Sequence, residues 1–323
     1  MPLLQVDNLV KHFRIRGGFF NRIIKQVYAV NGVSLAVEEG ETLGIVGESG
    51  CGKTTLGKMI IRLIEPNSGT VRFGNDVITD LNHSQLRSVR KNLQFIFQDP
   101  YSSLNPRLTV RELLKEVIKL HRVVPREQIE NYSMELLGKV GLHPDAADKY
   151  PHEFSGGQRQ RIGIARALSL KPRFIVADEP VSALDVSIQA QILNLLKDLK
   201  EEFGLTVLFI SHDLKVIEHF CDRIMVMYLG HVVESISSDN LHQGARHPYT
   251  QALLQANPIN DPNDRKPLEA LKGEVPSPFN PPKGCPFESR CPIAEARCHE
   301  SMPPLQPIGA ENHQVACWVT SPK

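Results

Sequence analysis

The chain has 323 residues, enough for one large domain with an appendage or for two domains. Its 37 lysines and arginines nearly balance its 36 aspartates and glutamates, so the net charge of +1 creates no global basic field to hold nucleic acid or an acidic membrane surface. No apolar run approaches the roughly 18 residues that span a membrane, and the N-terminus lacks the pattern of a signal peptide. We therefore expect a cytosolic protein whose thiols stay reduced.

Strand and helix patterns alternate along residues 1–257. Apolar runs typical of strands in a mostly parallel sheet lie at Thr42–Val46, Leu93–Phe97, Phe174–Ala177, Val207–Ile210 and Ile224–Met227. A capping box from Thr109 to Glu112 predicts the start of a helix, and a later helical stripe is expected to end at Gly204. That stripe consists of Ile188, Ile192, Leu195, Leu199 and Phe203. The alternation predicts an α/β fold with a helical insert at about residues 100–165.

The composition changes after residue 257. Residues 1–257 hold 10 of the 23 prolines, whereas residues 258–323 hold the other 13, together with four of the six cysteines. Periodic apolar runs are few in this final segment. We expect residues 258–323 to form an irregular tail that builds little core of its own.

The phosphate loop, GESGCGKT from Gly47 to Thr54, matches the pattern G-x-x-x-x-G-K-[ST] and lies between a strand pattern and a helix pattern. Its glycines let backbone N–H groups turn inward around phosphate oxygens, and the helix start adds partial positive charge. Lys53 can reach the β- and γ-phosphates, and the Thr54 hydroxyl can ligate Mg²⁺. The segment predicts a nucleoside triphosphate site.

A further strand pattern, RFIVADE from Arg173 to Glu179, ends in two acids. Asp178 suits Mg²⁺, directly or through a bound water, and Glu179 suits a general base that activates water in line with the γ-phosphate. Two solvated acids after a strand would be the ordinary interpretation if the phosphate loop were missing.

Together the motifs resemble those of the ATP-binding-cassette family. FSGGQRQR, Phe154 to Arg161, is similar to the family's signature sequence, and SALD, Ser182 to Asp185, is similar to its D-loop. Gln98 resembles the Q-loop glutamine, and His212 resembles the switch histidine. The likeness covers about residues 3–240. It implies a P-loop cassette ATPase with a mostly parallel core sheet, antiparallel N-terminal strands and a helical subdomain that carries the signature.

The resemblance implies a role for each matching residue. Nucleotide contacts would come from Phe13, Gly47, Ser49, Gly50, Cys51, Gly52, Lys53, Thr54 and Thr55. Tyr28 competes with Phe13 for the place beneath adenine. Catalysis would involve Glu179, His212, Gln98 and Lys53, and Mg²⁺ would be held through Thr54, Gln98 and Asp178.

The signature segment implies a pair of cassettes. Ser155, Gly156, Gly157 and Gln158 open a helix and form a second anion-binding turn, which one chain cannot easily aim at its own phosphate loop. The resemblance implies a head-to-tail pair in which this turn contacts the ATP of the partner, beside the D-loop residues Ser182, Ala183, Leu184 and Asp185. ATP would hold the pair closed, and hydrolysis would let it open.

Several segments resemble the ATPases of dipeptide and oligopeptide importers, best the second of the two paralogous ATPases that such systems carry. They are DPYSSLNPRLTV after Gln98, HPYTQALL at 247–254, GEVPSPFNPPKGC at 273–285 and the cysteine tail. The resemblance implies a peripheral subunit on the cytoplasmic face of the cell membrane. Its partners would be a paralogous cassette, two transmembrane permease subunits and, through them, an extracytoplasmic peptide-binding protein, with no nucleic acid; residues 99–106 would face a permease.

Two alternatives stay open. The same kind of tail occurs in ATPases that import nickel, glutathione or another small solute. From a different class, a soluble cassette ATPase of DNA repair or translation would usually carry two cassettes or a long nucleic-acid-binding insert, and this chain has neither pattern.

The four clustered cysteines, Cys285, Cys291, Cys298 and Cys317, are spaced C-x₅-C-x₆-C-x₁₈-C. The tight knuckles of most structural zinc sites are missing, whereas looser spacing and four thiolates suit a [4Fe–4S] cluster. The similar tails of peptide-importer ATPases favour the same interpretation, with zinc or free thiols as alternatives. Bound metal would supply folding energy that the proline-rich tail lacks, so we predict a metal-binding tail at 258–323.

Overall fold

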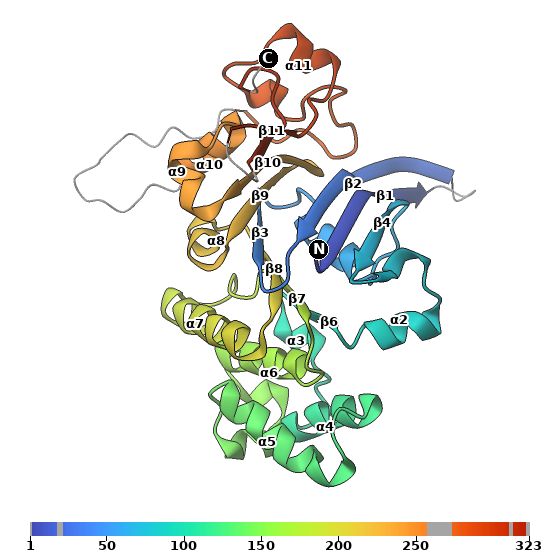
Figure 1. The fold of residues 1–323 in the computed structure, drawn as a ribbon, viewed down its shortest axis with the longest axis vertical. Helices are drawn as coiled ribbons and strands as arrows, with labels where there is room; N and C mark the ends of the chain where they lie inside the picture. Colours follow the sequence, from blue (N-terminus) through green and yellow to red (C-terminus); the bar gives the residue numbers. More distant parts are fainter. Residues whose placement is uncertain (1, 18–21, 257–272, 310–312, 321–323) are drawn as a thin grey trace, which may run out of the picture. The chain divides into compact units, whose positions relative to one another are not determined.

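The computed structural model describes residues 2–17, 22–256, 273–309 and 313–320. Its backbone divides into two compact units. Unit 1 comprises Met1–Leu3, Val37–Thr42 and Asp80–Ile210, and unit 2 comprises Leu4–Ala36, Leu43–Thr79 and Ser211–Lys323. Both units combine strands and helices, as the α/β prediction requires (Figure 1).

Unit 1 contains three parallel strands, β6 (Leu93–Ile96), β7 (Phe174–Asp178) and β8 (Thr206–Ser211). Phe174 of β7 pairs with Leu93 on one side and with Thr206 on the other. Every residue of β7 and β8 is buried, because apolar side chains cover both faces of a parallel sheet. The structure confirms these three strand predictions to within one residue at each end.

Helices fill the segment between β6 and β7, as the helical insert at about 100–165 predicts. The elements between these two strands are α3 (Pro100–Ser103), α4 (Val110–His121), η2 (Arg126–Gln128), α5 (Ile129–Lys139), η3 (Pro144–Asp148), η4 (Pro151–Glu153) and α6 (Gly156–Leu168). Unit 1 also has α2 (His83–Val89), which precedes β6, and α7 (Val186–Phe203), which follows β7. Figure 1 shows α4, α5 and α6 gathered together, in green.

The predicted helix ends are confirmed. The Thr109 side chain accepts the Glu112 N–H while the Glu112 carboxylate accepts the Thr109 N–H, so the capping box starts α4. Helix α7 ends at Gly204, whose φ is 61°. Both signals depend on neighbouring residues alone, which is why the sequence carries them.

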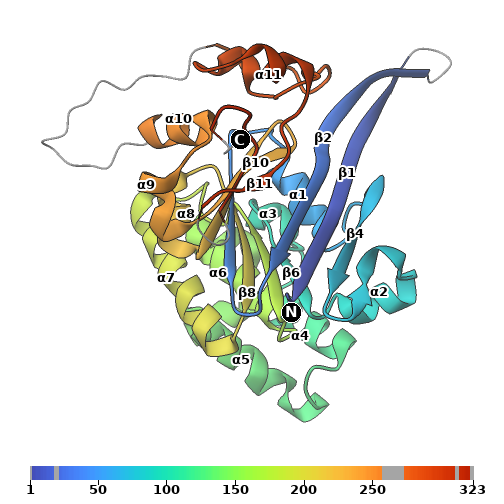
Figure 2. The ribbon, with the colours of Figure 1, turned by 45° about the horizontal axis from the view of Figure 1, so that its top comes forward.

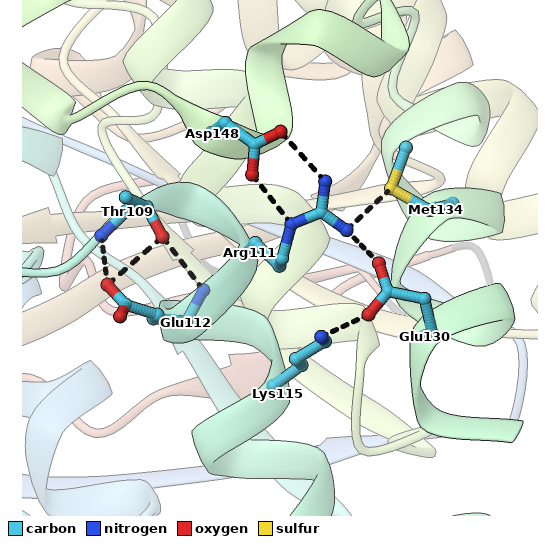
Figure 3. A network of polar contacts seen from close by, with 7 residues as sticks. All are labelled: Thr109, Arg111, Glu112, Lys115, Glu130, Met134 and Asp148. Atoms are coloured by element: carbon cyan, nitrogen blue, oxygen red, sulfur yellow. Dashed lines mark hydrogen bonds and ion pairs between the residues drawn. The ribbon is translucent and has the colours of Figure 1, made fainter. Parts of the chain in front are cut away.

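A polar network ties α4 to α5 and η3 (Figure 3). The Arg111 guanidinium donates to both Asp148 oxygens, at 2.8 and 3.0 Å, and also contacts Glu130. Lys115 pairs with the same Glu130 carboxylate. The hydrogen bond from Arg111 lowers the pKa of Asp148, so the contribution of this pair to stability is present above the ordinary aspartate pKa and falls as Asp148 protonates.

Unit 2 contains a four-stranded sheet of order β2-β1-β4-β5. Its strands are β1 (Leu4–Gly17), β2 (Arg22–Val37), β4 (Ser68–Phe73) and β5 (Asp76–Val77). The pairs β1–β4 and β4–β5 are antiparallel, as predicted for the N-terminal strands. Figure 2 shows β1 and β2 as two long strands that run side by side.

The same unit pairs β3 (Thr42–Val46) in parallel with β9 (Arg223–Tyr228), and β9 in antiparallel with β10 (His231–Ser237). Both predicted strands, at 42–46 and 224–227, are thereby confirmed. The helical elements of this part are α1 (Lys53–Ile60), η1 (Ile78–Asp80), α8 (Leu214–Phe220), η5 (Ser238–Asn240), α9 (Leu241–Gly244) and α10 (Pro248–Ala256). Within the described ranges, no helix has the length and apolar character to cross a membrane.

The described part of the tail is more ordered than the sequence predicts. It contains η6 (Glu288–Arg290), α11 (Ala296–Glu300), β11 (Gln306–Pro307) and β12 (Gln314–Val315). Strand β12 pairs antiparallel with β10, and Ile308, Val315 and Cys317 form a small apolar cluster. The rest of the described tail is irregular, as expected, and the two-residue strands leave no periodic pattern in the sequence. The predicted boundary at 257/258 falls outside the described residues.

Candidate functional site

The phosphate loop connects β3 to α1 within unit 2. The Lys53 ammonium lies inside this loop and is buried, with Nζ donating to the Gly47 carbonyl at 2.7 Å and to the Glu48 carbonyl at 3.1 Å. Ser49 and Gly50 are exposed at its tip, and Thr54 and Thr55 are half-buried in the first turn of α1. The sequence therefore places a buried cation and a helix start in one loop, the arrangement that binds anionic phosphate.

Two glycines of the loop permit a backbone course that side chains would block. A Cβ at Gly47, where φ is +157°, would lie 2.1 Å from the Met227 carbonyl oxygen. At Gly52, where φ is +108°, it would lie 2.0 Å from the Ala29 carbonyl oxygen. Close backbone approach, as much as left-handed geometry, therefore requires glycine at these positions.

Cys51 is packed into the same loop. Its carbonyl accepts the Gly230 N–H at 2.8 Å, and its thiol lies 3.8 Å from Lys53 Nζ. Burial raises the pKa of Cys51, and the nearby Lys53 lowers it only in part, so the thiol is neutral near pH 7. Cys51 is not among the residues that line the cavity of the tail cysteines.

The acidic end of β7 forms a second cluster, in unit 1. Asp178 is buried, and Glu179 has a φ of 45°, a conformation that costs a non-glycine residue on the order of 1 kcal/mol. The Glu179 N–H donates to the Ile210 carbonyl at 2.9 Å, and its carboxylate accepts from Gln98 Nε2 at 3.0 Å. The structure thus brings together Gln98 and Glu179, which are 81 residues apart in the chain.

The signature turn and the D-loop also meet within unit 1. Ser155 caps α6 through a capping box with Gln158, while Ser155 and Gly156 are exposed. A Cβ at Gly156 would lie 3.3 Å from Leu184, and one at Gly157 would lie 2.6 Å from Ile188 of α7. Glycines therefore let α6 approach the D-loop and α7 closely.

Hydrogen bonds between residues close in the sequence also hold the D-loop in place. Ser182 donates from Oγ to the Glu179 carbonyl at 3.1 Å, and the Asp185 carboxylate caps α7 by accepting the Ile188 N–H at 3.0 Å. Ala183 is exposed between them. The D-loop is thus linked directly to the residue predicted as the base.

His212 follows β8 and belongs to unit 2. Its side chain is exposed, and the next residue, Asp213, caps α8 by accepting the Lys215 N–H at 2.9 Å. The turn that carries the histidine is therefore fixed by a helix cap.

The two candidate aromatic rings lie in different surroundings within unit 2. The Phe13 ring is 37% exposed, and the Lys11 ammonium lies 5.2 Å from its centroid. The Tyr28 ring is half-buried and lies 4.5 Å from the His12 ring. Phe13 is the more exposed of the two residues, and its place beneath adenine stays a prediction.

All four tail cysteines line one cavity, with Trp318 and Phe287 also in its wall. The cavity volume is about 10 Å³, room for about one water molecule. Cys285 and Cys298 are further joined by a backbone hydrogen bond of 2.8 Å. Burial raises the pKa of Cys285 to about 12 and also raises that of Cys291, so these thiols are neutral at pH 7. In the described part of the chain, no group of three or more His, Cys, Asp or Glu residues is arranged to hold a metal ion.

One contact to the phosphate loop comes from a distant part of the chain. Arg290 of η6 binds the Glu48 carboxylate, and the Tyr249 hydroxyl of α10 accepts the Glu48 N–H at 2.9 Å. Glu48 and Arg290 are 242 residues apart, so no local pattern connects them. The segment HPYT at 247–250 carries a family resemblance in the sequence, and in the structure all four of its residues are buried.

Comparison with known proteins gives two family matches. The model described as "ABC transporter" matches residues 30–182, and the model described as "Oligopeptide/dipeptide transporter, C-terminal region" matches residues 233–298.

Similar proteins cover the whole chain. The oligopeptide transport ATP-binding protein AppF of Bacillus subtilis is 52% identical over 99% of this chain and 98% of its own length. The probable peptide ABC transporter ATP-binding protein y4tS of Sinorhizobium fredii is 51% identical over 99% of this chain and 90% of its own length. Among solved structures, the dimeric post-hydrolysis state of the ATP-binding cassette MJ0796 bound to ADP and Pi has a TM-score of 0.65 and 34% identity, covering 73% of this chain and 98% of that one.

Proposed function

Because this chain belongs to the ABC transporter ATPases that carry the oligopeptide/dipeptide transporter C-terminal region, we propose that it hydrolyses ATP to drive the import of peptides through separate permease subunits. The observation that carries the chemistry is the buried Lys53 ammonium inside a glycine-lined loop at the start of α1. The names of the relatives, which are similar over the full chain, support peptides as the cargo. The working place would be the cytoplasmic face of the cell membrane.

The phosphate loop binds the ATP phosphates in this proposal. Backbone N–H groups between Gly47 and Thr55 and the ammonium of Lys53 contact phosphate oxygens, and Phe13 stacks on adenine. Lys53 exchanges its bonds to the Gly47 and Glu48 carbonyls for bonds to phosphate. The cation is thereby held in place before the ligand arrives, which reduces the cost of ordering it.

Glu179 is the general base in this proposal, and Gln98 holds the attacking water beside it. Their hydrogen bond of 3.0 Å supports a joint role, since one proton acceptor and one amide then face the same water. Thr54, Gln98 and Asp178 offer hydroxyl, amide and carboxylate oxygens, the ligands that Mg²⁺ prefers. When bound, Mg²⁺ neutralises charge on the phosphate oxygens, and His212 contacts the γ-phosphate.

The working unit is a head-to-tail pair with a paralogous cassette. The exposed Ser155 and Gly156 support this arrangement, because they place the start of α6, where an anion can bind, within reach of another chain. The similar cassette MJ0796 is described as dimeric in its ADP-bound state. The D-loop, fixed to Glu179 through Ser182, would lie at the same interface.

This assembly predicts that the chain alone is a poor ATPase. Its rate of phosphate release is expected to be at least about tenfold below that of the complex with the second cassette and the permeases, because the partner's anion-binding turn is missing. Phosphate release by the purified full-length chain, before and after addition of its partners, measures this. An equal rate from the lone monomer would contradict the pairing.

We also propose that the tail cysteines hold a [4Fe–4S] cluster, with residues 1–257 as the nucleotide-binding domain and 258–323 as the tail. That all four line one cavity supports the donor set, since four thiolates are the usual ligands of such a cluster. The present cavity is too small for a cluster, so the four thiols must move apart to hold it. Bound metal would add a cross-link among the tail segments that carry the four cysteines, and would thereby contribute to the folding of the tail.

An anaerobic preparation is expected to be brown and to contain about four iron and four sulfide per chain. Cys291→Ser should lose the colour, whereas Cys51→Ser and Cys221→Ser should keep it, because those two thiols lie outside the cavity. Iron and sulfide analysis with visible absorbance measures this. A colourless chain with one tightly bound zinc ion would contradict the cluster and favour the zinc site instead.

A further inference from the structure

Glu48, the second residue of the phosphate loop, is held by an arginine from the tail. Arg290 donates from Nη1 to Oε2 of Glu48 at 2.8 Å and from Nη2 to Oε1 at 3.1 Å. Only 4% of the Arg290 side chain and 26% of the Glu48 side chain are exposed. A bidentate pair with so little solvent is among the stronger and more directional polar contacts in a protein.

Aromatic rings fix the guanidinium from its other side. Arg290 Nη1 also donates to the Tyr228 hydroxyl at 3.2 Å, and the Tyr228 and Phe287 ring centroids lie 5.8 and 5.9 Å from the guanidinium carbon. The Tyr249 ring packs at a tilt against Tyr228, with the two centroids 4.6 Å apart. Its hydroxyl accepts the Glu48 N–H, so the backbone of the loop and its carboxylate are both held.

The pair also has an electrostatic consequence for the loop. The Glu48 carbonyl accepts from Lys53 Nζ at 3.1 Å, so Glu48 lies beside the cation expected to bind phosphate. An unpaired carboxylate there would repel an anionic ligand, and the repulsion is strong where water is scarce. Arg290 neutralises that charge through the bidentate pair.

We infer that Arg290 is a positioning residue, which acts through Glu48 to hold the phosphate loop ready for ATP, so that the tail contributes to nucleotide affinity. The inference rests on the proposed function, since it takes the loop as the ATP site. Arg290 lies in the turn between Cys285 and Cys291, where its N–H donates to the Phe287 carbonyl at 3.0 Å. A displacement of this cysteine-bearing turn would therefore move the guanidinium away from Glu48.

The test is a double-mutant cycle on the full-length chain, read by titration with mant-ATP and Mg²⁺. Arg290→Met is expected to weaken binding about tenfold, the change that about 1.4 kcal/mol produces. Glu48→Gln should weaken binding less than Arg290→Met does, because it loses the bidentate pair but leaves no unpaired carboxylate beside the loop. In the double variant the effect of Arg290→Met should shrink to less than about threefold, because Arg290 acts through that carboxylate.

Arg297→Met is the matched control, since Arg297 also lies in the tail, pairs with Glu295 and stacks on Trp318, away from the loop. It should leave the affinity for mant-ATP within about twofold of the wild type, below the coupling expected of residues in contact. Arg290→Lys, which keeps the charge and loses the paired geometry, should give an intermediate affinity and serves if Arg290→Met does not fold.

Three results would overturn the inference. The first is a wild-type affinity for mant-ATP in Arg290→Met or Arg290→Lys. The second is a tenfold loss of affinity on Arg290→Met even when Glu48→Gln is present. The third is an equal loss of affinity in Arg297→Met, which would mean general disorder of the tail. A wild-type chain that does not bind mant-ATP would instead contradict the proposed function itself.

Discussion

Glu179→Gln is expected to lower ATP turnover by about 10²-fold or more, within the range for loss of a general base, while ATP still binds. The carboxamide has the same shape as the carboxylate and can keep a hydrogen bond to Gln98, which now lies 3.0 Å away. It cannot accept the proton of the attacking water. The variant should therefore accumulate as an ATP-bound pair of cassettes.

Phosphate release by the assembled complex measures the turnover, and size-exclusion chromatography with ATP measures the trapped pair. Glu201→Gln is a matched control, because Glu201 is exposed on α7 of the same unit. It should hydrolyse ATP at the wild-type rate. Near-normal hydrolysis by Glu179→Gln would remove Glu179 from the role of base.

Gly52→Ala is expected to weaken nucleotide binding by at least about 100-fold, equivalent to about 2.7 kcal/mol. The new Cβ would lie 2.0 Å from the Ala29 carbonyl oxygen, at a φ of +108° that alanine rarely adopts. The loop or β2 must move to relieve the clash, and the N–H groups that surround phosphate then lose their positions. Titration of the full-length chain with mant-ATP measures the loss.

Gly50→Ala is the control for this prediction. Gly50 also has a positive φ, +81°, but no atom lies within 4 Å of its added Cβ. Only backbone strain of roughly 1–2 kcal/mol is then introduced, so binding should fall by less than about 30-fold. Equal losses in the two variants would show that close approach to Ala29 is not what shapes the loop.

The sequence predicted those features that depend on neighbouring residues. An uninterrupted apolar run predicts strand β3 at Thr42–Val46, and the capping box at Thr109 predicts the start of α4. The phosphate loop was recognised for the same reason, since its lysine and glycines are adjacent in the chain. The roles assigned to its residues stay predictions.

Other features depend on contacts between distant segments and were missed. Strand β12 has only two residues, and it exists because it pairs with the edge of β10. The link from Arg290 to Glu48 likewise joins positions 242 residues apart. No sequence pattern indicates the φ of 45° at Glu179. This backbone geometry is held by the hydrogen bond from the Glu179 N–H to the Ile210 carbonyl and by the turn that follows.

ATP hydrolysis by this chain, as we propose, drives peptide import. Its most direct test is the uptake of a radiolabelled tripeptide by proteoliposomes that contain both permease subunits and both cassettes, with ATP in the lumen and the peptide-binding protein outside. We expect uptake that requires ATP and that falls by about 10²-fold or more with Glu179→Gln, as ATP turnover does. Peptide uptake at the wild-type rate with Glu179→Gln, or vesicles that take up Ni²⁺ or glutathione but no peptide, would contradict it.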